Sequence, residues 1–328
     1  MARYWFAQPT PHYRAKLAFF AFLLAFIVIL LGGFTRLTNA GLSCPDWPNC
    51  YGYLTAPHTP AQIQTATAYY PLTPVNTQKA WTEMTHRYFA GTEGILILIL
   101  TFSILLTKKF RGKKPVLPSL LLIILLCIQV SLGMLTVTEK LKPIIVLSHL
   151  LTGISILSVL WWIFLSLRFP VDPFIKKANA HLTPWFLIGL IVVFIQITLG
   201  GWVSTHSAGL ACIDLPYCNG QLIPQLSLNM NSDLITIHML HRFGAFFTAV
   251  YIGILALSLL RNTYFKPFSV LMLTLLCLQL ALGILNILWL RPIWIALIHQ
   301  GVAILLLLTM ITVLTKVISD NRHGFYLV

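Results

Sequence analysis

Residues 32–52 read GGFTRLTNAGLSCPDWPNCYG, and residues 200–220 read GGWVSTHSAGLACIDLPYCNG. The two stretches are 168 residues apart, and two cysteines of each fall in register. Both stretches follow a long apolar run, at the point where a membrane-spanning helix would end. The chain therefore repeats one unit, in which an apolar helix leads into a cysteine-bearing loop.

The composition is that of a membrane protein. Hydrophobic residues make up 58% of the 328 residues and charged residues 9%, whereas soluble domains carry about 25% charged residues. Apolar runs of about 18 residues or more predict transmembrane helices, and the chain contains eight such runs. We expect an all-α membrane protein of eight transmembrane helices, arranged as two tandem pseudo-symmetric four-helix bundles. The predicted spans lie near residues 17–35, 85–106, 116–137, 144–167, 185–203, 236–260, 268–290 and 292–315.

The basic residues indicate how the chain crosses the membrane. A net charge of +14 could indicate nucleic acid binding, but 15 of the 22 Lys and Arg residues fall in the tails and short loops on the side of the N-terminus. Cytoplasmic loops carry such an excess. We therefore expect cytoplasmic termini, periplasmic cysteine loops and no nucleic acid partner. The first apolar run is too long for a cleavable signal, so a bacterial inner membrane is the expected location.

The repeat extends to polar residues inside the predicted helices. Four helices per unit is an even number, which gives the two halves the same orientation. We expect an N-terminal half at residues 1–168, a cytoplasmic linker at 169–183 and a C-terminal half at 184–328. The matched polar residues are His86 and His241, Arg87 and Arg242, Gln129 and Gln279, and His149 and His299.

The four histidines indicate heme. His86 and His149 lie in helices that both run from outside to inside, so their imidazoles should lie at similar depth, and His241 with His299 repeats the arrangement. Polar groups within a membrane face the bundle interior, and two imidazoles from separate helices suit axial ligation of heme iron. A single such histidine would more often be a hydrogen-bonded core residue. Zinc or copper is less favoured, because no third and fourth ligand lies at the same depth.

Other polar residues surround these pairs. Arg36, Arg87 and Arg242 are candidates to hold heme propionates, with snorkelling interfacial anchors as the alternative. Gln129 and Gln279 are expected to make interhelical hydrogen bonds.

The cysteines divide into two groups. Cys44 with Cys50, and Cys212 with Cys218, lie in loops on the oxidising side, so two local disulfides are expected. They serve either as loop staples, which we favour for the first pair, or as redox-active dithiols. Cys127 and Cys277 lie in helices and are expected to be buried thiols.

At these residues the chain resembles the heme A synthase family. The resemblance rests on Thr35-Arg36-Leu37-Thr38, on GLSCPDWP at 41–48, on Glu83-Met84-Thr85-His86-Arg87, and on the other three histidines. It implies oxidation of a ring methyl of heme O, through an alcohol, to the formyl group of heme A for cytochrome oxidase. Its implied partners are heme O, the heme O-producing farnesyltransferase, cytochrome oxidase assembly factors, an electron carrier and the lipid bilayer.

The resemblance also implies roles for single residues. His86 and His149 would be the iron ligands of the substrate heme O, and His241 and His299 those of a heme b cofactor. Glu83 matches the family's catalytic acidic position, and Cys44 and Cys50 match its first-loop cysteine pair.

The repeat breaks at Glu83, whose counterpart is His238, and at Arg36, whose counterpart is Ser204. Residues three apart share a helix face, so Glu83 should lie beside His86. There a carboxylate can accept the protons released by oxidation; the alternative is an interfacial carboxylate near a helix N-terminus. Two polar residues have no assigned role: Glu93 is either a proton-relay acid or a bundle-facing hydrogen bonder, and His206 is expected on the surface.

Other functions explain fewer of these features. A quinol-linked di-heme b-type electron-transfer protein would need the four histidines but not Glu83. A disulfide-generating quinone reductase would use the cysteines but not the paired histidines. A transporter is the weakest alternative, because no broken helices occur in matched positions.

Overall fold

The computed structural model describes residues 12–107, 115–168, 181–227 and 233–321. Eight of the helices in these ranges are long and apolar enough to cross a membrane, which confirms the predicted all-α fold. These eight are α1 (His12–Leu37), α3 (Thr77–Leu105), α4 (Val116–Thr138), α5 (Pro143–Arg168), α6 (Thr183–Thr205), α7 (Leu234–Leu259), α8 (Lys266–Leu288) and α9 (Ile293–Asn321). The predicted linker falls mainly on residues 169–180, which lie outside the described residues, and α6 already starts at Thr183.

The cysteine loop of the first half contains structure that hydropathy did not predict. Helix α2 (Pro60–Tyr69) begins at a capping box, in which the Thr59 side chain accepts from the backbone of Gln62 and the Gln62 side chain accepts from the backbone of Thr59. Helix α3 begins eight residues before the predicted 85, because Asn76 caps it by accepting a hydrogen bond from the backbone N–H of Lys79. Thus α3 carries Glu83 within a helix rather than a loop.

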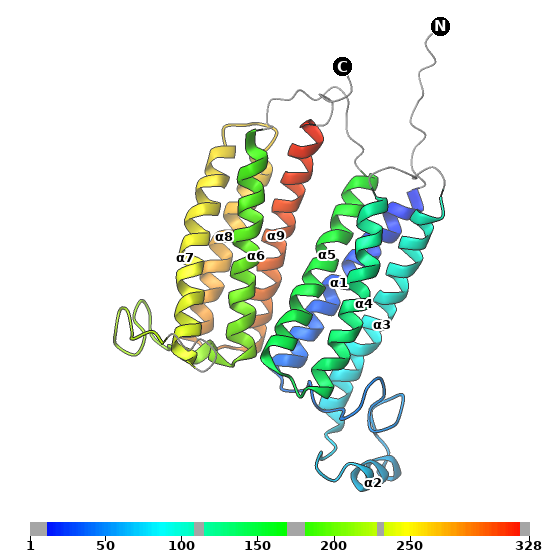
Figure 1. The fold of residues 1–328 in the computed structure, drawn as a ribbon. Coiled ribbons are helices and arrows are strands. Elements are labelled where there is room, and N and C mark those ends of the chain that lie inside the picture. The colour runs from blue at the N-terminus through cyan, green and yellow to red at the C-terminus, as the bar shows by residue number, and fades with distance from the viewer. Residues whose placement is uncertain (1–11, 108–114, 169–180, 228–232, 322–328) are drawn as a thin grey trace.

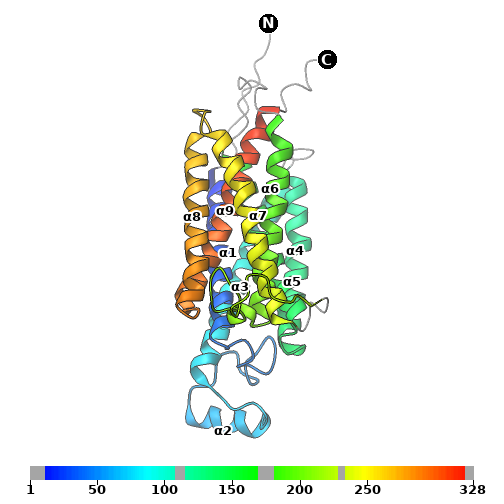
Figure 2. The ribbon, with the colours of Figure 1, turned by 90° about the vertical axis from the view of Figure 1, so that its left-hand side faces the viewer.

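The spanning helices contact one another in two groups (Figures 1 and 2). Helices α1, α3, α4 and α5 form one group and α6 to α9 the other, which is compatible with the predicted tandem bundles. Both cysteine loops lie at one end, and α1 begins and α9 ends at the opposite end (Figure 1). Within each group every helix touches its neighbours along the chain, and the first helix also touches the last.

The two groups meet through a pair of matched glycines. A Cβ on Gly33 of α1 would lie 2.4 Å from the side-chain oxygen of Gln300 on α9. A Cβ on Gly201 of α6 would lie 2.7 Å from the Leu147 side chain on α5. Each glycine thus lets the last helix of the other group approach closely, as small residues do in membrane helix pairs.

The two cysteine loops share their backbone conformation. Both contain a cis proline, Pro48 in the first and Pro216 in the second, and both turn through a glycine with φ of +80°. In the first loop Asp46 accepts hydrogen bonds from the backbone N–H groups of Tyr51 and Gly52. In the second, Asp214 accepts them from residues 219 and 220. The repeated sequence therefore folds into a repeated loop.

Candidate functional site

Each histidine of the first half lies against a glycine of a neighbouring helix. A Cβ on Gly32 of α1 would lie 3.1 Å from Cε1 of His86, and one on Gly133 of α4 would lie 3.3 Å from Cε1 of His149. Because glycine has no side chain, α1 and α4 leave room for both rings between the helices.

The second half repeats this geometry almost to the tenth of an ångström. The Cβ position of Gly200 lies 3.0 Å from Cε1 of His241, and that of Gly283 lies 3.3 Å from Cε1 of His299. The first glycine of each repeated Gly-Gly pair therefore leaves room for a histidine of its own half. The second glycine leaves room for a helix of the other half.

Glutamines flank the second histidine of each pair. The Gln129 amide nitrogen lies 3.5 Å from Nε2 of His149, and that of Gln279 lies 3.2 Å from Nε2 of His299. The predicted interhelical role of these glutamines is therefore directed at the histidines themselves. Among the described residues, Nδ1 of His86, of His149 and of His299 has no hydrogen-bond partner.

Gln196 of α6 is a residue that sequence reasoning missed. Its amide nitrogen lies 3.0 Å from Nδ1 of His241 and 3.0 Å from the His241 carbonyl oxygen. The matching position in the first half is Val28, which has no side-chain hydrogen-bonding group. The signal was present as a break in the repeat, since Gln196 is a polar residue in an otherwise apolar run.

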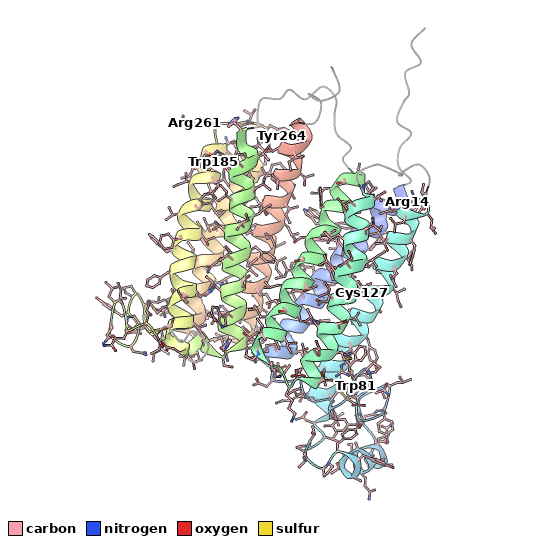
Figure 3. The ribbon with its side chains drawn as sticks, in the orientation of Figure 1. Arg14, Trp81, Cys127, Trp185, Arg261 and Tyr264 are labelled. Carbon is pink, nitrogen blue, oxygen red and sulfur yellow. A yellow bond between two sulfur atoms is a disulfide. The ribbon has the colours of Figure 1, made fainter. Side chains whose placement is uncertain are left out.

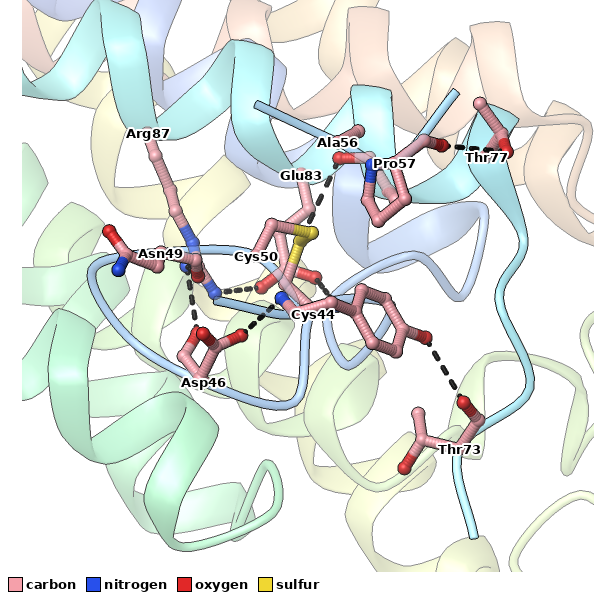
Figure 4. The surroundings of a disulfide bond; sticks show 12 residues. Cys44, Asp46, Asn49, Cys50, Ala56, Pro57, Thr73, Thr77, Glu83 and Arg87 are labelled. Carbon is pink, nitrogen blue, oxygen red and sulfur yellow. Dashed lines mark hydrogen bonds and ion pairs between the residues drawn. A yellow bond between two sulfur atoms is a disulfide. The ribbon is translucent and has the colours of Figure 1, made fainter. Parts of the chain in front are cut away.

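Glu83 fastens the first cysteine loop to α3 (Figure 4). Its Oε2 accepts a hydrogen bond of 3.0 Å from the backbone N–H of Cys44, and its Oε1 lies 2.6 Å from the Arg87 guanidinium. Arg87 in turn donates to the carbonyl oxygens of Asp46, Pro48 and Asn49. Only 5% of the Glu83 side chain is exposed, so this ion pair is shielded from water.

The second half fastens its loop without an acid. Nδ1 of His238 lies 2.9 Å from the carbonyl oxygen of Ala208, and Arg242 donates to the carbonyl oxygens of Cys212 and Tyr217. Glu83 and His238, which the repeat predicts to be counterparts, thus occupy matching positions in the structure. Both residues hold the loop, but only the first half gains a carboxylate there.

The three arginines proposed for propionates contact backbone carbonyls. Arg36 reaches across to the other half, where it donates to the carbonyl of Ser204 at 2.7 Å and to the Ser207 hydroxyl at 3.3 Å. Arg87 and Arg242 hold the two loops, and Nε of Arg242 has no partner among the described residues. A role with propionates stays a prediction for all three.

Disulfides close both loops at matching positions. Cys44 is joined to Cys50, and Cys212 to Cys218, and all four cysteines are fully buried. Thiol exchange requires access to a sulfur, so burial supports the staple. Tyr51 packs beside the first disulfide; burial, followed by the charges of Glu83 and Asp46, raises the pKa of its phenol.

Two thiols and two unassigned residues complete the comparison with the sequence. The prediction that Cys127 and Cys277 are buried was wrong, because both are exposed; Figure 3 labels Cys127 on α4. His206 is the C-cap residue of α6. Its side chain folds back onto this helix, where Nδ1 lies 3.1 Å from the Trp202 carbonyl oxygen. Glu93 faces the interior of the first half, buried and without a partner among the described residues.

Known proteins resemble the chain along most of its length. The sequence model of a family described as "Cytochrome oxidase assembly protein" matches residues 15–311. A heme A synthase of Shewanella oneidensis is 40% identical over 306 residues, covering 88% of this chain and 91% of the relative. Heme A synthases of Neorickettsia sennetsu and Allorhizobium ampelinum are 29% and 30% identical, covering 90% and 87% of this chain and 96% and 85% of the relatives.

Proposed function

The chain belongs to the heme A synthase family, and from that premise we propose how its two halves divide the reaction. The chain is a multi-pass membrane oxidoreductase that acts on heme O, oxidising a ring methyl through an alcohol to the formyl group of heme A. In our proposal residues 1–168 hold the substrate heme O between His86 and His149, and residues 184–328 hold heme b between His241 and His299.

The observation that carries this proposal is the pair of matched histidine sites. Two imidazoles on separate helices form the donor set of a bis-histidine heme. In the first half, Nδ1 of both histidines has no hydrogen-bond partner among the described residues. Among the described residues, no group of three or more His, Cys, Asp or Glu side chains is arranged to hold a metal ion by itself. The residues therefore fit an iron porphyrin in each half. Heme b, when bound, supplies one-electron transfer.

The difference between Glu83 and His238 supports the assignment of the chemistry to the first half. Each of the two oxidation steps removes a pair of electrons and releases protons. A carboxylate beside the ring accepts such protons, and Glu83 lies one helical turn from His86, fixed by Cys44 and Arg87. In this reading Glu83 both anchors the loop and receives protons, whereas His238 only anchors.

The surroundings follow from the same proposal. The cysteine loops lie in the periplasm and the termini in the cytoplasm, in agreement with the basic residues on the terminal side. The chain takes heme O from the farnesyltransferase that makes it, passes electrons to a carrier and delivers heme A to cytochrome oxidase assembly. Arg36, Arg87 and Arg242 have several donors each, so a guanidinium that holds a loop carbonyl also has donors for a propionate.

Heme extraction distinguishes this function from electron transfer between two hemes b. The protein is purified from cells that make heme O and from cells that do not, and its pigments are separated by chromatography. We expect heme b in both preparations, and heme A or its alcohol precursor only with heme O supplied. Two equivalents of heme b and no product in the presence of heme O would contradict the proposal.

A further inference from the structure

Glu93 is a buried carboxyl group in the first half that the proposed chemistry does not use. Only 6% of the residue is exposed, and among the described residues neither carboxyl oxygen has a hydrogen-bond partner. A buried, unpartnered carboxyl is costly, and within a membrane it marks a functional position. Glu93 therefore needs a partner that the described part of the polypeptide does not supply.

The position of Glu93 places that partner in the site of His86. Glu93 follows His86 by seven residues on α3, so both lie on one helix face, about 10 Å apart along the axis. On this face His86 and Ala90 are only partly buried, whereas Glu93 and then Ile97 are buried. Glu93 is thus the first buried residue beyond His86 on this face, and we call Glu93 and Ile97 the floor of the proposed heme O site.

The direction of the helix places the Glu93 carboxyl group on the side of Glu93 that faces His86. Side chains of helical residues lean toward the helix N-terminus. The N-terminus of α3 lies at the end with the cysteine loops, which is also the end nearer His86 (Figure 1). The Glu93 side chain therefore leans from the floor back toward the histidine.

The second half has a different residue at the matching place. The counterpart of Glu93 is Thr248, which is also buried, at 7% exposure. Ile252, the counterpart of Ile97, is buried as well, so the second half has a matching floor. The glycines and the histidines of the two sites match closely, so the floor is one of few places where the sites differ. The two porphyrins differ at one substituent, since heme O carries a long hydroxyalkyl chain where heme b carries a vinyl group.

The charge of the propionates fixes which edge of the porphyrin reaches the floor. Anionic propionates are directed toward the aqueous phase at the loop end, because charge is disfavoured deeper in the membrane. The opposite edge, which bears the hydroxyalkyl chain of heme O, then faces inward. Its hydroxyl is the only hydrogen-bonding group on that edge. Glu93 is a buried residue of the first half whose two carboxyl oxygens have no partner among the described residues.

We propose that Glu93 binds the hydroxyl group of the heme O side chain and thereby selects heme O over heme b in the first half. This inference rests on the proposed function, which puts heme O there. A carboxylate accepts a hydrogen bond from a hydroxyl, and a carboxylic acid can also donate one. A site built around a hydroxyl rejects an analogue that lacks it more strongly than an apolar pocket does. Glu93 is in this view a specificity-determining residue.

The test measures binding preference rather than turnover. The full-length protein is purified from cells that make heme b but not heme O, and the first site is titrated with heme b and with iron hematoporphyrin, followed by Soret absorbance. Iron hematoporphyrin carries hydroxyethyl groups in place of vinyl groups and has no long tail, so it isolates the hydroxyl. The variants are Glu93→Met, which keeps the side-chain length, Glu93→Gln, which keeps hydrogen bonding, and Thr248→Val, the matched control.

We expect the wild type and Thr248→Val to prefer the hydroxylated porphyrin by roughly 2- to 10-fold, the range of one hydrogen bond between neutral groups. Glu93→Met should lose this preference while binding heme b as before, and Glu93→Gln should keep part of it. An unchanged preference in Glu93→Met would overturn the inference. A His86→Leu variant identifies the titrated site: if it still binds added heme like the wild type, the assignment of heme O to the first half fails instead. Retained heme b in the second half reports correct folding of each variant.

Discussion

The two halves of the molecule share a scaffold and differ in the residues that carry charge. Both have the Gly-Gly pair, the disulfide loop and two histidines against glycines, in matching places. They differ at Glu83 and His238, at Glu93 and Thr248, and at Val28 and Gln196. Both acids belong to the first half, whereas Gln196 fixes the His241 ring in the second. In the proposed function one frame holds two porphyrins, and we expect a few buried polar groups to decide which porphyrin is oxidised and which is retained.

Loss of one proposed iron ligand from each half should give the largest effect and separate the two sites. His299→Leu should remove the heme b spectrum from an inserted protein, because one imidazole of the pair is gone. His149→Leu should leave heme b in place and abolish formation of heme A. Reduced-minus-oxidised spectra and heme chromatography measure both. Normal heme b content in His299→Leu would break the division of roles between the halves.

Exchange of the residue that anchors each loop should give the next largest effect. Glu83→Gln retains the size of the side chain but removes its basicity, so heme A formation should fall by about 100- to 10,000-fold, the usual contribution of a general base. Heme O or the alcohol should accumulate in its place. His238→Gln in the second half should cost less than about tenfold on the same scale. Heme chromatography after a fixed period of heme O supply gives the rates.

The control for this pair of variants tests whether the cysteine loop stays in place. Because Glu83 also holds Cys44 and Arg87, a displaced loop would lower activity without any role in proton transfer. Alkylation without reductant reports whether the Cys44–Cys50 disulfide stays closed. A closed disulfide with normal heme A formation in Glu83→Gln would remove the case for catalysis by the first half.

The glycines beneath the histidines should give smaller, matched effects. An added Cβ would lie 3.1 Å from His86 at Gly32 and 3.0 Å from His241 at Gly200, so each ring must shift by a few tenths of an ångström. We expect Gly32→Ala to weaken heme O binding by about tenfold, equivalent to about 1.4 kcal/mol, with heme b unaffected. Gly200→Ala should do the reverse. Equal loss of both hemes in either variant would show that the sites are not independent.

The smallest effect concerns the acid sensitivity of the second loop. Hydrogen bonds from the backbone of Gly220, followed by that of Asn219, lower the pKa of Asp214. Because the pKa is lower in the folded state, the carboxylate stabilises the loop at every pH above the unfolded pKa of about 3.9. This stabilisation is lost as the pH falls through the folded pKa. The protection of the amides of residues 219 and 220 against exchange, corrected for the intrinsic pH dependence of exchange, should therefore fall at low pH in the wild type. Asp214→Asn should remove that pH dependence, and an unchanged dependence in the variant would contradict this account.

Local patterns accounted for the helices and the repeat, but not for what packs against what. Eight apolar runs sufficed for eight spans, because a bilayer requires helices of that length. Helix α2 was missed because its ten residues are weakly apolar, and the local sequence signal for it is the capping box at Thr59. Cys127 was misjudged because a helix that is apolar all round gives no periodic signal of which face meets lipid. The contact between Gly32 and His86 joins residues 54 positions apart, and no local pattern contains it.

The second glycine of each pair gives the molecule a symmetry that extends beyond its two sites. Gly33 lets α9 approach α1, and Gly201 lets α5 approach α6, while α5 also touches α9, its own counterpart. Each half therefore presents the same patch to the other, which is the isologous contact of a two-fold dimer. The molecule has the architecture of a homodimer joined into one polypeptide, and covalent joining is what allows its two subunits to carry different side chains. A symmetric dimer of identical chains would have placed the same acid in both sites.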